Sequence, residues 1–537
     1  MPTTPPATLP HTPAAPLPPS THAQNQTEVF AVHGADPEVL AYAMAKYSRS
    51  SLSMRQSLRE ISAQRAEQFL NTFYFQYGHR SIADLAHVAF AIERLSLLAA
   101  IVLVDEQRWD GQERSTRYQN FLKSGWYLPN FGAETEVRQL YTQTAEALFT
   151  AYASTSSSVF EALKSRVACP AEMKQDAYER TLKARAFDVA RYMLPLATNT
   201  SLGQIVNART LETQVSRLLS HPAAEIRDLG GKLREAATGP AWNLHAEANA
   251  DLQAKIAALS PELAAESEPL LTRAVHASPT LVKYAQPNPY EQQSRAELTQ
   301  AAAELLANIP IAAAPVVDLV ERTETLEVEL TATLIYSASH HPYRQIRDLV
   351  ASLPESRTAE IIELGLRHRG RHDELLRAFH AGAQLRFDIL MDIGGFRDMH
   401  RHRRCTQIIQ EFTHLHGYET PESGDAAGLA EAGILAEYQA SIEAAHTASR
   451  KIAASNEPEA AQSALYLLPL ATRIRALFKM DFAEAVYISE LRSAPAGHFS
   501  YRKVAWEMYL AVQRQHPSLA KYFRATDFTE PIDILKR

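Results

Sequence analysis

Apolar residues recur three and four positions apart along most of this chain, which is the pattern of helices with one buried face. Residues 37–50, 135–163 and 223–237 show it clearly. Two segments differ, because residues 87–93 and 385–393 are short, apolar and partly alternating. We therefore predict a mostly helical chain with a half-buried strand at each of these two places, each leading into a helix-like run that ends in charged residues.

The two halves of the chain share a repeated segment. Residues 191–198 read RYMLPLAT and residues 465–472 read LYLLPLAT, with six of eight positions identical. Each is preceded upstream by the strand-then-helix pattern and followed by a helical stretch that carries an arginine, Arg217 or Arg492. The same order of three features in both halves predicts a tandem duplication with heavy divergence.

Composition divides the chain into four parts. Residues 1–27 are rich in Pro, Thr and Ala and hold no Lys, Arg, Asp or Glu, which predicts a disordered tail, either a dispensable extension or a docking segment. This tail lacks the basic start and apolar core of a signal peptide. The Pro-rich stretch 260–294 indicates a linker, so we expect one domain over 28–259 and a second over 295–537.

Length and charge narrow the class of protein. At 537 residues, the chain is too long for one ordinary core. Its net charge of −7 argues against a general nucleic-acid binder, and we find no apolar run of the roughly 20 residues that a membrane span needs. The only two cysteines, Cys169 and Cys405, exclude a disulfide framework and a cysteine-based zinc site. They fit the reducing cytosol, so we expect a cytoplasmic protein.

Against this acidic balance, residues 401–404 read Arg-His-Arg-Arg, directly after the second predicted strand and helix. Such a cluster favours an anion, since the guanidinium fork binds phosphate and planar imides in bidentate fashion. The first half adds further guanidinium groups and polar side chains. The arginines are Arg117, Arg191, Arg209 and Arg217, and the polar residues are Ser115, Asn207 and His79. Any one of these is more typical of a solvated surface residue. We see neither metal-ligand spacing nor a Gly-rich phosphate loop.

Taken in order, the motifs resemble a known family. Residues 77–90 read YGHRSIADLAHVAF, followed by ERSTRY at 113–118, RYMLP at 191–195 and NAR at 207–209, and then Arg-His-Arg at 401–403. This order resembles that of the flavin-dependent thymidylate synthases, over two copies from about residue 28 to 530. The resemblance implies an α+β fold in which each copy is a small antiparallel sheet flanked by long helices.

The resemblance also implies a chemistry. That family transfers a methylene from methylenetetrahydrofolate to dUMP and reduces it with flavin hydride, using FAD and NADPH, and no cysteine attacks the pyrimidine. The scarcity of cysteine in this chain agrees. The family forms homotetramers with sites between subunits, so two copies in one chain imply a homodimer that amounts to a pseudo-tetramer.

Residue roles follow from the same resemblance. Contacts to FAD are implied for His79, Ser81, Asp84, Asn207, Arg209, Arg401, His402 and Arg403. Contacts to dUMP are implied for Ser115, Arg117, Arg191, Arg217, Arg401 and Arg492. Of these, Arg191 would lie against the uracil carbonyls and stabilise charge on the ring, while Ser115 and Arg117 would orient the substrate. The Arg-His-Arg run would then be a buried anion clamp.

The two copies depart from the family pattern in complementary ways. Asp105-Glu106-Gln107 stands in the first copy where Arg-His-Arg is expected, and these two acids would repel a phosphate. The second copy keeps Arg-His-Arg but has Glu411 for the later serine, Leu465 for the arginine of RxxLP, and Asp-Phe-Ala at 481–483 for Asn-Ala-Arg. We therefore hypothesise one composite site that draws on both copies.

Two alternatives stay open. A flavin-dependent enzyme could act on another pyrimidine nucleotide, which the divergent first copy makes credible. A non-catalytic nucleotide- or flavin-binding scaffold could also use the duplicated fold, with both copies decayed.

Overall fold

The computed structural model describes residues 30, 32, 34–46, 54–60, 80–131, 136–282, 285–370, 373–421 and 429–535. The predicted tail at 1–27 lies outside these residues, as does His79. Residues Asp36–Arg537 form one compact unit, so the two copies pack against each other. No helix in the described ranges is long and apolar enough to cross a membrane.

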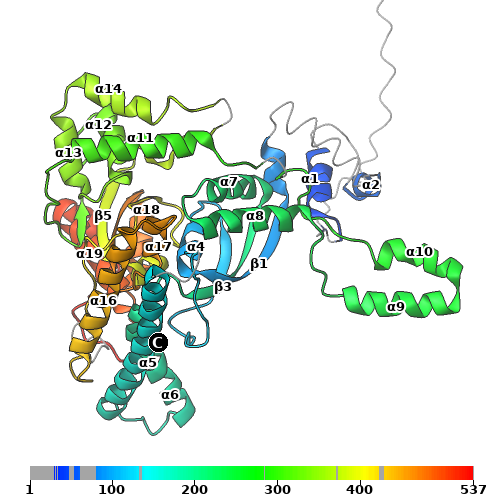
Figure 1. The fold of residues 1–537 in the computed structure, drawn as a ribbon, viewed down its shortest axis with the longest axis horizontal. Coiled ribbons are helices and arrows are strands. Elements are labelled where there is room, and N and C mark those ends of the chain that lie inside the picture. Colours follow the sequence, from blue (N-terminus) through cyan, green and yellow to red (C-terminus); the bar gives the residue numbers. More distant parts are fainter. Residues whose placement is uncertain are drawn as a thin grey trace, which may run out of the picture. The chain divides into compact units, whose positions relative to one another are not determined.

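The first copy is built on a three-stranded antiparallel sheet. Its strands are β1 (His87–Ser96), β2 (Asp110–Glu113) and β3 (Asn199–Asn207), in the order β1-β3-β2 (Figure 1). Residue 87 of β1 pairs with residue 207 of β3, so the start of one strand lies beside the end of the other. This register brings His87 and Asn207 to one edge of the sheet.

The second copy has a four-stranded antiparallel sheet. Its strands are β4 (Val317–Leu319), β5 (Leu385–Asp392), β6 (Thr406–Ile409) and β7 (Arg473–Met480), in the order β4-β5-β7-β6. The two strands predicted from sequence are β1 and β5, and both are present. Two small antiparallel sheets among many helices confirm the predicted α+β class.

Matching helix caps show that the copies share one topology. β1 and β5 each lead into a seven-residue helix, α4 (Leu97–Leu103) or α15 (Ile393–Met399), whose first turn is capped by the side chain of Ser96 or Asp392. β3 and β7 lead into α7 (Ala208–Leu219) and α18 (Phe482–Ser493), capped by Asn207 and Asp481. A side-chain oxygen at the N-cap satisfies a free backbone N–H, so the order of elements is the same in both halves.

The duplicated LPLAT segments pair with each other. Pro195 and Pro469 form an antiparallel bridge. The Leu196 N–H donates to the Leu468 carbonyl at 2.9 Å, and the Leu470 N–H donates to the Leu194 carbonyl at 2.9 Å. This reciprocal pattern resembles the contact of a symmetric dimer made within one chain. It places Arg191, which precedes the first segment, beside the second copy.

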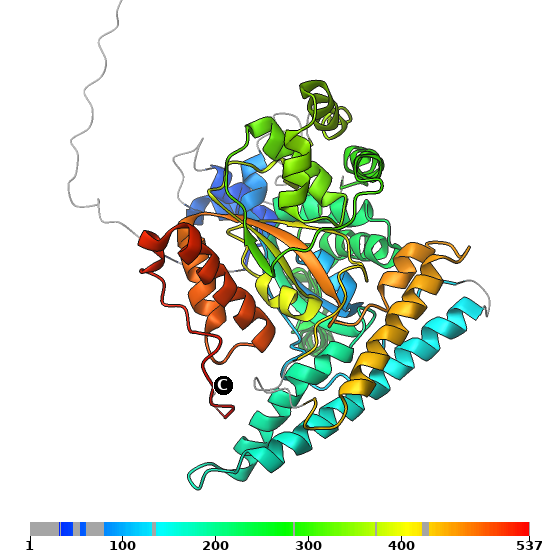
Figure 2. The ribbon, with the colours of Figure 1, turned by 90° about the vertical axis from the view of Figure 1, so that its left-hand side faces the viewer.

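Long helices reinforce this junction. α5 (Glu136–Arg166) packs on α6 (Gln175–Ala190) from its own copy and on α16 (Leu435–Ala453) from the other. Figure 2 shows α5 in cyan and α16 in orange running side by side. The largest cluster of buried apolar residues accordingly contains residues of both copies.

The stretch 260–294 is not an unstructured connection. It contains α10 (Pro261–Leu271), which pairs with α9 (Ala246–Leu259) as a helical hairpin, and the start of α11 (Pro289–Leu305) (Figure 1). The remaining elements are α1 (Pro37–Lys46), α2 (Met54–Glu60), η3 (Arg80–Leu85), η4 (Arg191–Met193), α8 (Ala224–Thr238), α12 (Leu326–Ser337), α13 (Tyr343–Ala351), α14 (Glu355–Leu364), η5 (Arg377–Phe379), α17 (Ala460–Leu465), α19 (Phe499–Gln515) and α20 (Pro517–Ala520).

Candidate functional site

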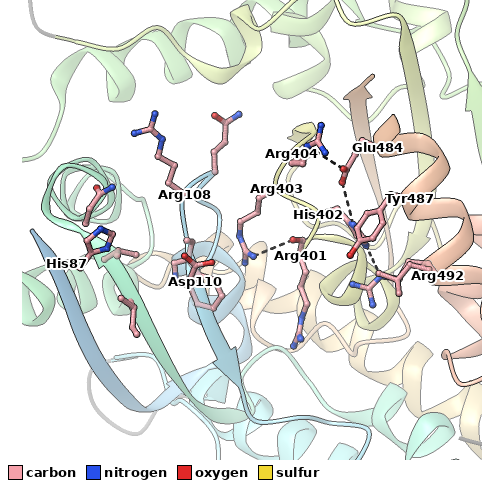
Figure 3. A pocket seen from close by; sticks show the side chains of 16 residues that line it. His87, Arg108, Asp110, Arg401, His402, Arg403, Arg404, Glu484, Tyr487 and Arg492 are labelled. Atoms are coloured by element: carbon pink, nitrogen blue, oxygen red, sulfur yellow. Dashed lines mark hydrogen bonds and ion pairs between the residues drawn. The ribbon is translucent and has the colours of Figure 1, made fainter. Parts of the chain in front are cut away.

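A pocket of about 630 Å³ opens between the two copies. The strands of the first copy form one wall, and the turn after α15 together with α18 forms the other (Figure 3). The first copy contributes His87, Gln107, Arg108, Trp109, Asp110, Ile205, Val206 and Asn207. The second contributes Arg401, His402, Arg403, Arg404, Glu484, Tyr487, Leu491 and Arg492. The volume lies within the range of ordinary ligand pockets.

The Arg-His-Arg run lies in the turn between α15 and β6. The His402 carbonyl accepts hydrogen bonds from Gln407 Nε2 at 2.8 Å and from Cys405 Sγ at 2.9 Å, which fixes the turn. Of the run, His402 is buried, Arg403 is half-buried, and Arg401 is exposed. The expected buried clamp is thus only half buried, because a tight turn at the pocket rim directs alternate side chains inward and outward.

His402 is held in its neutral form. Its Nε2 accepts a hydrogen bond from Arg492 Nε at 2.7 Å, and its Nδ1 lies 3.6 Å from Glu484 Oε1. Burial, aided by the nearby arginines, lowers the pKa of His402 to about 3. A neutral acceptor beside Arg492 orients the guanidinium without cancelling its charge.

Arg403 is a cation with little local compensation. Its guanidinium stacks on Trp109 of the first copy at 4.4 Å from the ring centroid. Its Nε is buried without a hydrogen-bond partner among the described residues. Burial and the adjacent Arg401 lower the pKa of Arg403 to about 10. Trp109 is fixed in turn, because its indole N–H donates to Gln204 at 2.7 Å.

The equivalent position in the first copy is closed by ion pairs. Asp105 lies nine residues after the cap Ser96, as Arg401 lies nine residues after Asp392. Asp105 pairs with Arg377. Burial by itself would raise the pKa of Asp105, but Arg377 and the other cationic neighbours outweigh burial and lower this pKa to about 2.

Glu106, the counterpart of His402, accepts hydrogen bonds from both Nε and Nη2 of Arg217, at 2.9 and 2.7 Å. Arg217 is thereby neutralised inside the protein and is not part of the pocket lining. It also differs in register from Arg492. Arg217 lies ten residues after its cap Asn207, and Arg492 lies eleven residues after Asp481, so the two arginines point in directions about 100° apart on their helices.

Arg117 forms a second cationic centre behind the pocket. It binds Asp188 through Nε at 2.8 Å and Nη2 at 3.2 Å, and it donates to the Tyr501 hydroxyl at 2.8 Å. The guanidinium carbons of Arg117 and Arg492 both lie over the Tyr501 ring, at 5.6 and 5.5 Å from its centroid. Ser115 accepts the Arg117 backbone N–H at 3.2 Å, so its hydroxyl stabilises the turn that carries Arg117.

Arg191 crosses from the first copy to α15 of the second. It is 1% exposed, and its Nη1 lies 3.3 Å from Asp398 Oδ2. Arg191 packs against Gly394 of α15, where a Cβ would be in van der Waals contact with Arg191 Nε at 3.4 Å. The Nε and Nη2 groups of Arg191 are buried without partners among the described residues. Buried arginine donors without acceptors are costly in a structural role.

The other predicted flavin contacts lie toward η3. Asp84 pairs with Arg209 at 3.5 Å and with Arg108, a pocket residue, at 3.4 Å. Ser81 is exposed on η3. Asn207 lines the pocket, although its side chain also caps α7. The structure therefore brings Asn207 together with Arg401, His402, Arg403 and Arg492. The predicted site residues outside that lining are Ser81, Asp84, Ser115, Arg117, Arg191, Arg209 and Arg217.

Several site residues carry no sequence signal. Trp109, Asp188, Asp398 and Tyr501 all contact the predicted arginines, yet each stands alone in the sequence as an ordinary core or surface residue. The pairing of the copies gives Trp109, Asp398 and Tyr501 their contacts with these arginines, whereas Asp188 binds Arg117 within the first copy. In the described ranges, no group of three or more His, Cys, Asp or Glu side chains could hold a metal ion.

Comparisons with known proteins agree with this architecture. The family described as "Thymidylate synthase complementing protein" matches residues 30–239 and 318–518, so the chain belongs to that family and carries two copies of its domain. A "UPF0159 protein" of Chlamydia muridarum (strain MoPn / Nigg) is 27% identical over 534 residues, which are 92% of this chain and 91% of that protein.

A "Flavin-dependent thymidylate synthase" of Clostridium tetani (strain Massachusetts / E88) is 25% identical over 200 residues, which are 37% of this chain and 76% of that protein. Among solved structures, the flavin-dependent thymidylate synthase ThyX from Helicobacter pylori, complexed with FAD and dUMP, is 19% identical. It covers 38% of this chain and 89% of its own, with a TM-score of 0.23.

Proposed function

We propose that this protein methylates dUMP to dTMP in an FAD-dependent reaction, with methylenetetrahydrofolate as carbon donor and NADPH as reductant, at one composite site per chain. The observation that carries the proposal is the pocket between the copies, where Asn207 of the first copy faces the Arg-His-Arg turn of the second. Each copy supplies what the other has lost.

The pocket residues fit FAD as an anionic and aromatic ligand. Five arginines line the pocket against two carboxylates, and the diphosphate of FAD would balance this excess. The Arg403–Trp109 stack offers a flat cationic surface to an aromatic ring. The buried, unpartnered Nε of Arg403 lacks the acceptor that such a ligand provides.

Bound FAD would supply the hydride chemistry. In the net reaction the C5–H bond of dUMP breaks, a C5–C bond forms, and the methylene carbon leaves the folate nitrogens as a methyl group; NADPH provides the two electrons. The protein's own part is to bind and orient. Arg401 and Arg492, which line the pocket, would hold anionic groups. Arg117 and Arg191, which are buried behind the lining, would add positive charge that stabilises charge developing on the pyrimidine.

Assembly and location are part of the same proposal. We infer a homodimer of this chain acting in the cytoplasm, since the family resemblance implies four domains and two cysteines suit a reducing compartment. NADPH, methylenetetrahydrofolate and the dimer rest on that resemblance.

The first test is the visible absorption spectrum of the purified protein with FAD, before and after dUMP is added. We expect an oxidised-flavin spectrum that dUMP perturbs, saturation at one FAD per chain, and dTMP formation when both co-substrates are present. Arg401→Glu should abolish flavin and dUMP binding, because a carboxylate would face the ligand's phosphates.

Arg514→Glu, an exposed position in the last turn of α19, is the matched control and should bind both ligands normally. A protein that takes up no flavin in either condition would exclude the enzyme and leave the scaffold alternative. Flavin binding without dTMP formation would favour the second candidate, an enzyme acting on another pyrimidine nucleotide, which Asp105 and Glu106 in place of Arg-His in the first copy favour.

A further inference from the structure

One acidic side chain, Asp398, interacts with four of the arginines implied for dUMP. Asp398 belongs to α15, three residues before Arg401, and its side chain is 19% exposed. One carboxylate oxygen lies 3.3 Å from Arg191 Nη1, across the boundary between the copies. Asp398 also interacts electrostatically with Arg117, Arg401 and Arg492.

Among the arginines near Asp398, Arg117 already has another carboxylate as its partner, whereas Arg492 contacts a neutral side chain. Arg117 has its own bidentate carboxylate, Asp188, and Arg492 contacts the neutral His402. Arg191, Arg401 and Arg492 therefore share the negative charge of Asp398. Asp392 also interacts electrostatically with Arg191 from within the same copy as Asp398. With three cations against these two carboxyl groups, the group keeps an excess of positive charge, which favours a phosphate monoester, an anion of about −1.5 to −2 at pH 7.

We propose that Asp398 is a built-in counter-ion of the anion site, which holds Arg191 when no ligand is bound and limits how strongly the site prefers a phosphorylated pyrimidine over its nucleoside. The carrier of the phosphate, dUMP, rests on the proposed function. The counter-ion role rests on the contact between Asp398 and Arg191.

The physical basis is competition between two anions for the same cations. A phosphate that approaches Arg401 or Arg492 in the pocket meets the like charge of Asp398, which already interacts with both arginines. Two like charges near each other in a partly exposed site repel appreciably. An uncharged nucleoside meets no such repulsion. Asp398 therefore weakens binding of the nucleotide selectively, and removing its charge should strengthen only the phosphate-bearing ligand.

The test compares wild type with Asp398→Asn, which keeps the shape and removes the charge. Dissociation constants for dUMP, deoxyuridine and inorganic phosphate are measured by calorimetry with FAD present. We expect about five- to tenfold tighter binding of dUMP and of phosphate, from the loss of one charge repulsion, and no comparable change for deoxyuridine. Higher salt should reduce the gain, since screening weakens both interactions.

Asp251→Asn, on the exposed face of α9, makes the same change in net charge far from the cluster and should alter none of the three constants. Thermal melting confirms that each variant is folded, and Asp398→Ser replaces Asp398→Asn if the latter is not. Unchanged or weaker phosphate binding in the variant overturns the counter-ion role, whatever dUMP does. If the variant binds phosphate more tightly but the protein does not bind dUMP, the proposed function is overturned and the counter-ion role of Asp398 is supported.

Discussion

At the scale of single residues, the two copies differ in the side chain that contacts Arg217 on α7 and its counterpart Arg492 on α18. In the second copy a neutral histidine, His402, faces Arg492. In the first copy a carboxylate, Glu106, faces Arg217. A guanidinium that already holds a carboxylate has little attraction left for a phosphate. This difference, together with the Asp105–Arg377 ion pair, separates the open anion site of the second copy from the closed position in the first.

Glu106→Gln should destabilise the fold, because it leaves Arg217 without its charge partner. The pair is partly exposed, with side chains 21% and 13% accessible, so we expect a loss of roughly 2 kcal/mol in the free energy of unfolding rather than the larger loss of a fully buried pair. Urea denaturation measures it. The double variant Glu106→Leu/Arg217→Met should recover most of the loss, and equal losses in the single and double variants would contradict the ion-pair account.

At the scale of elements, β2 supports the pocket by lying very close to β3. Gly111 is required there, because a Cβ would lie 2.3 Å from the Gly203 carbonyl oxygen and 2.5 Å from the Trp109 ring. Trp109 in turn carries Arg403 of the other copy. The contact between Trp109 of the first copy and Arg403 of the second therefore depends on the absence of a side chain at Gly111.

Gly111→Ala should cost about 1–3 kcal/mol in unfolding free energy, since neither the backbone oxygen nor the fixed indole can easily move. It should also weaken FAD binding by displacing Trp109. Gly231→Ala is the control, because nothing lies within 4 Å of its Cβ in α8, and alanine there should stabilise the helix by about 0.5–1 kcal/mol. If urea midpoints moved the same way in both variants, the close approach of β2 to β3 would not be the cause.

At the scale of the whole molecule, buried neutral histidines link folding to pH. Burial, aided by neighbouring arginines in each case, lowers the pKa of His402 and His221 to about 3, and burial lowers those of His416 and His446 to about 4. The unfolded chain takes up these protons near pH 6.5, and the folded chain does so only at much lower pH. Their contribution to stability is complete above pH 6.5 and is lost as pH falls toward 4.

We therefore expect the free energy of unfolding to fall between pH 7 and pH 5, by about 1 kcal/mol per pH unit for each such histidine below pH 6.5. Asp392, whose pKa burial raises to about 6, opposes this trend, as do other carboxyls whose pKa burial raises, such as Glu225 and Glu411, so they reduce the slope that the histidines set. His446→Gln should reduce the slope by about one proton in urea denaturation at stepped pH. A flat profile in wild type would refute the linkage.

The sequence by itself determined the elements and the repeat. Period and alternation are local properties, so the helices and the strands β1 and β5 were predictable, and the LPLAT repeat with its ordered motifs indicated two copies of one family. Arg401, His402, Arg403 and Asn207 stood in recognisable motifs and do meet in one pocket.

Only the tertiary structure decided which residues meet. The partners Arg117 and Tyr501, or Arg191 and Asp398, are hundreds of positions apart in the chain, and no local pattern encodes such a pair. The register of Arg217 against Arg492, the ion pairs that close the first copy, and the place of Asp398 among the arginines all follow from how the copies dock. Docking depends on the complementarity of whole surfaces, and the order of residues along the chain does not display it.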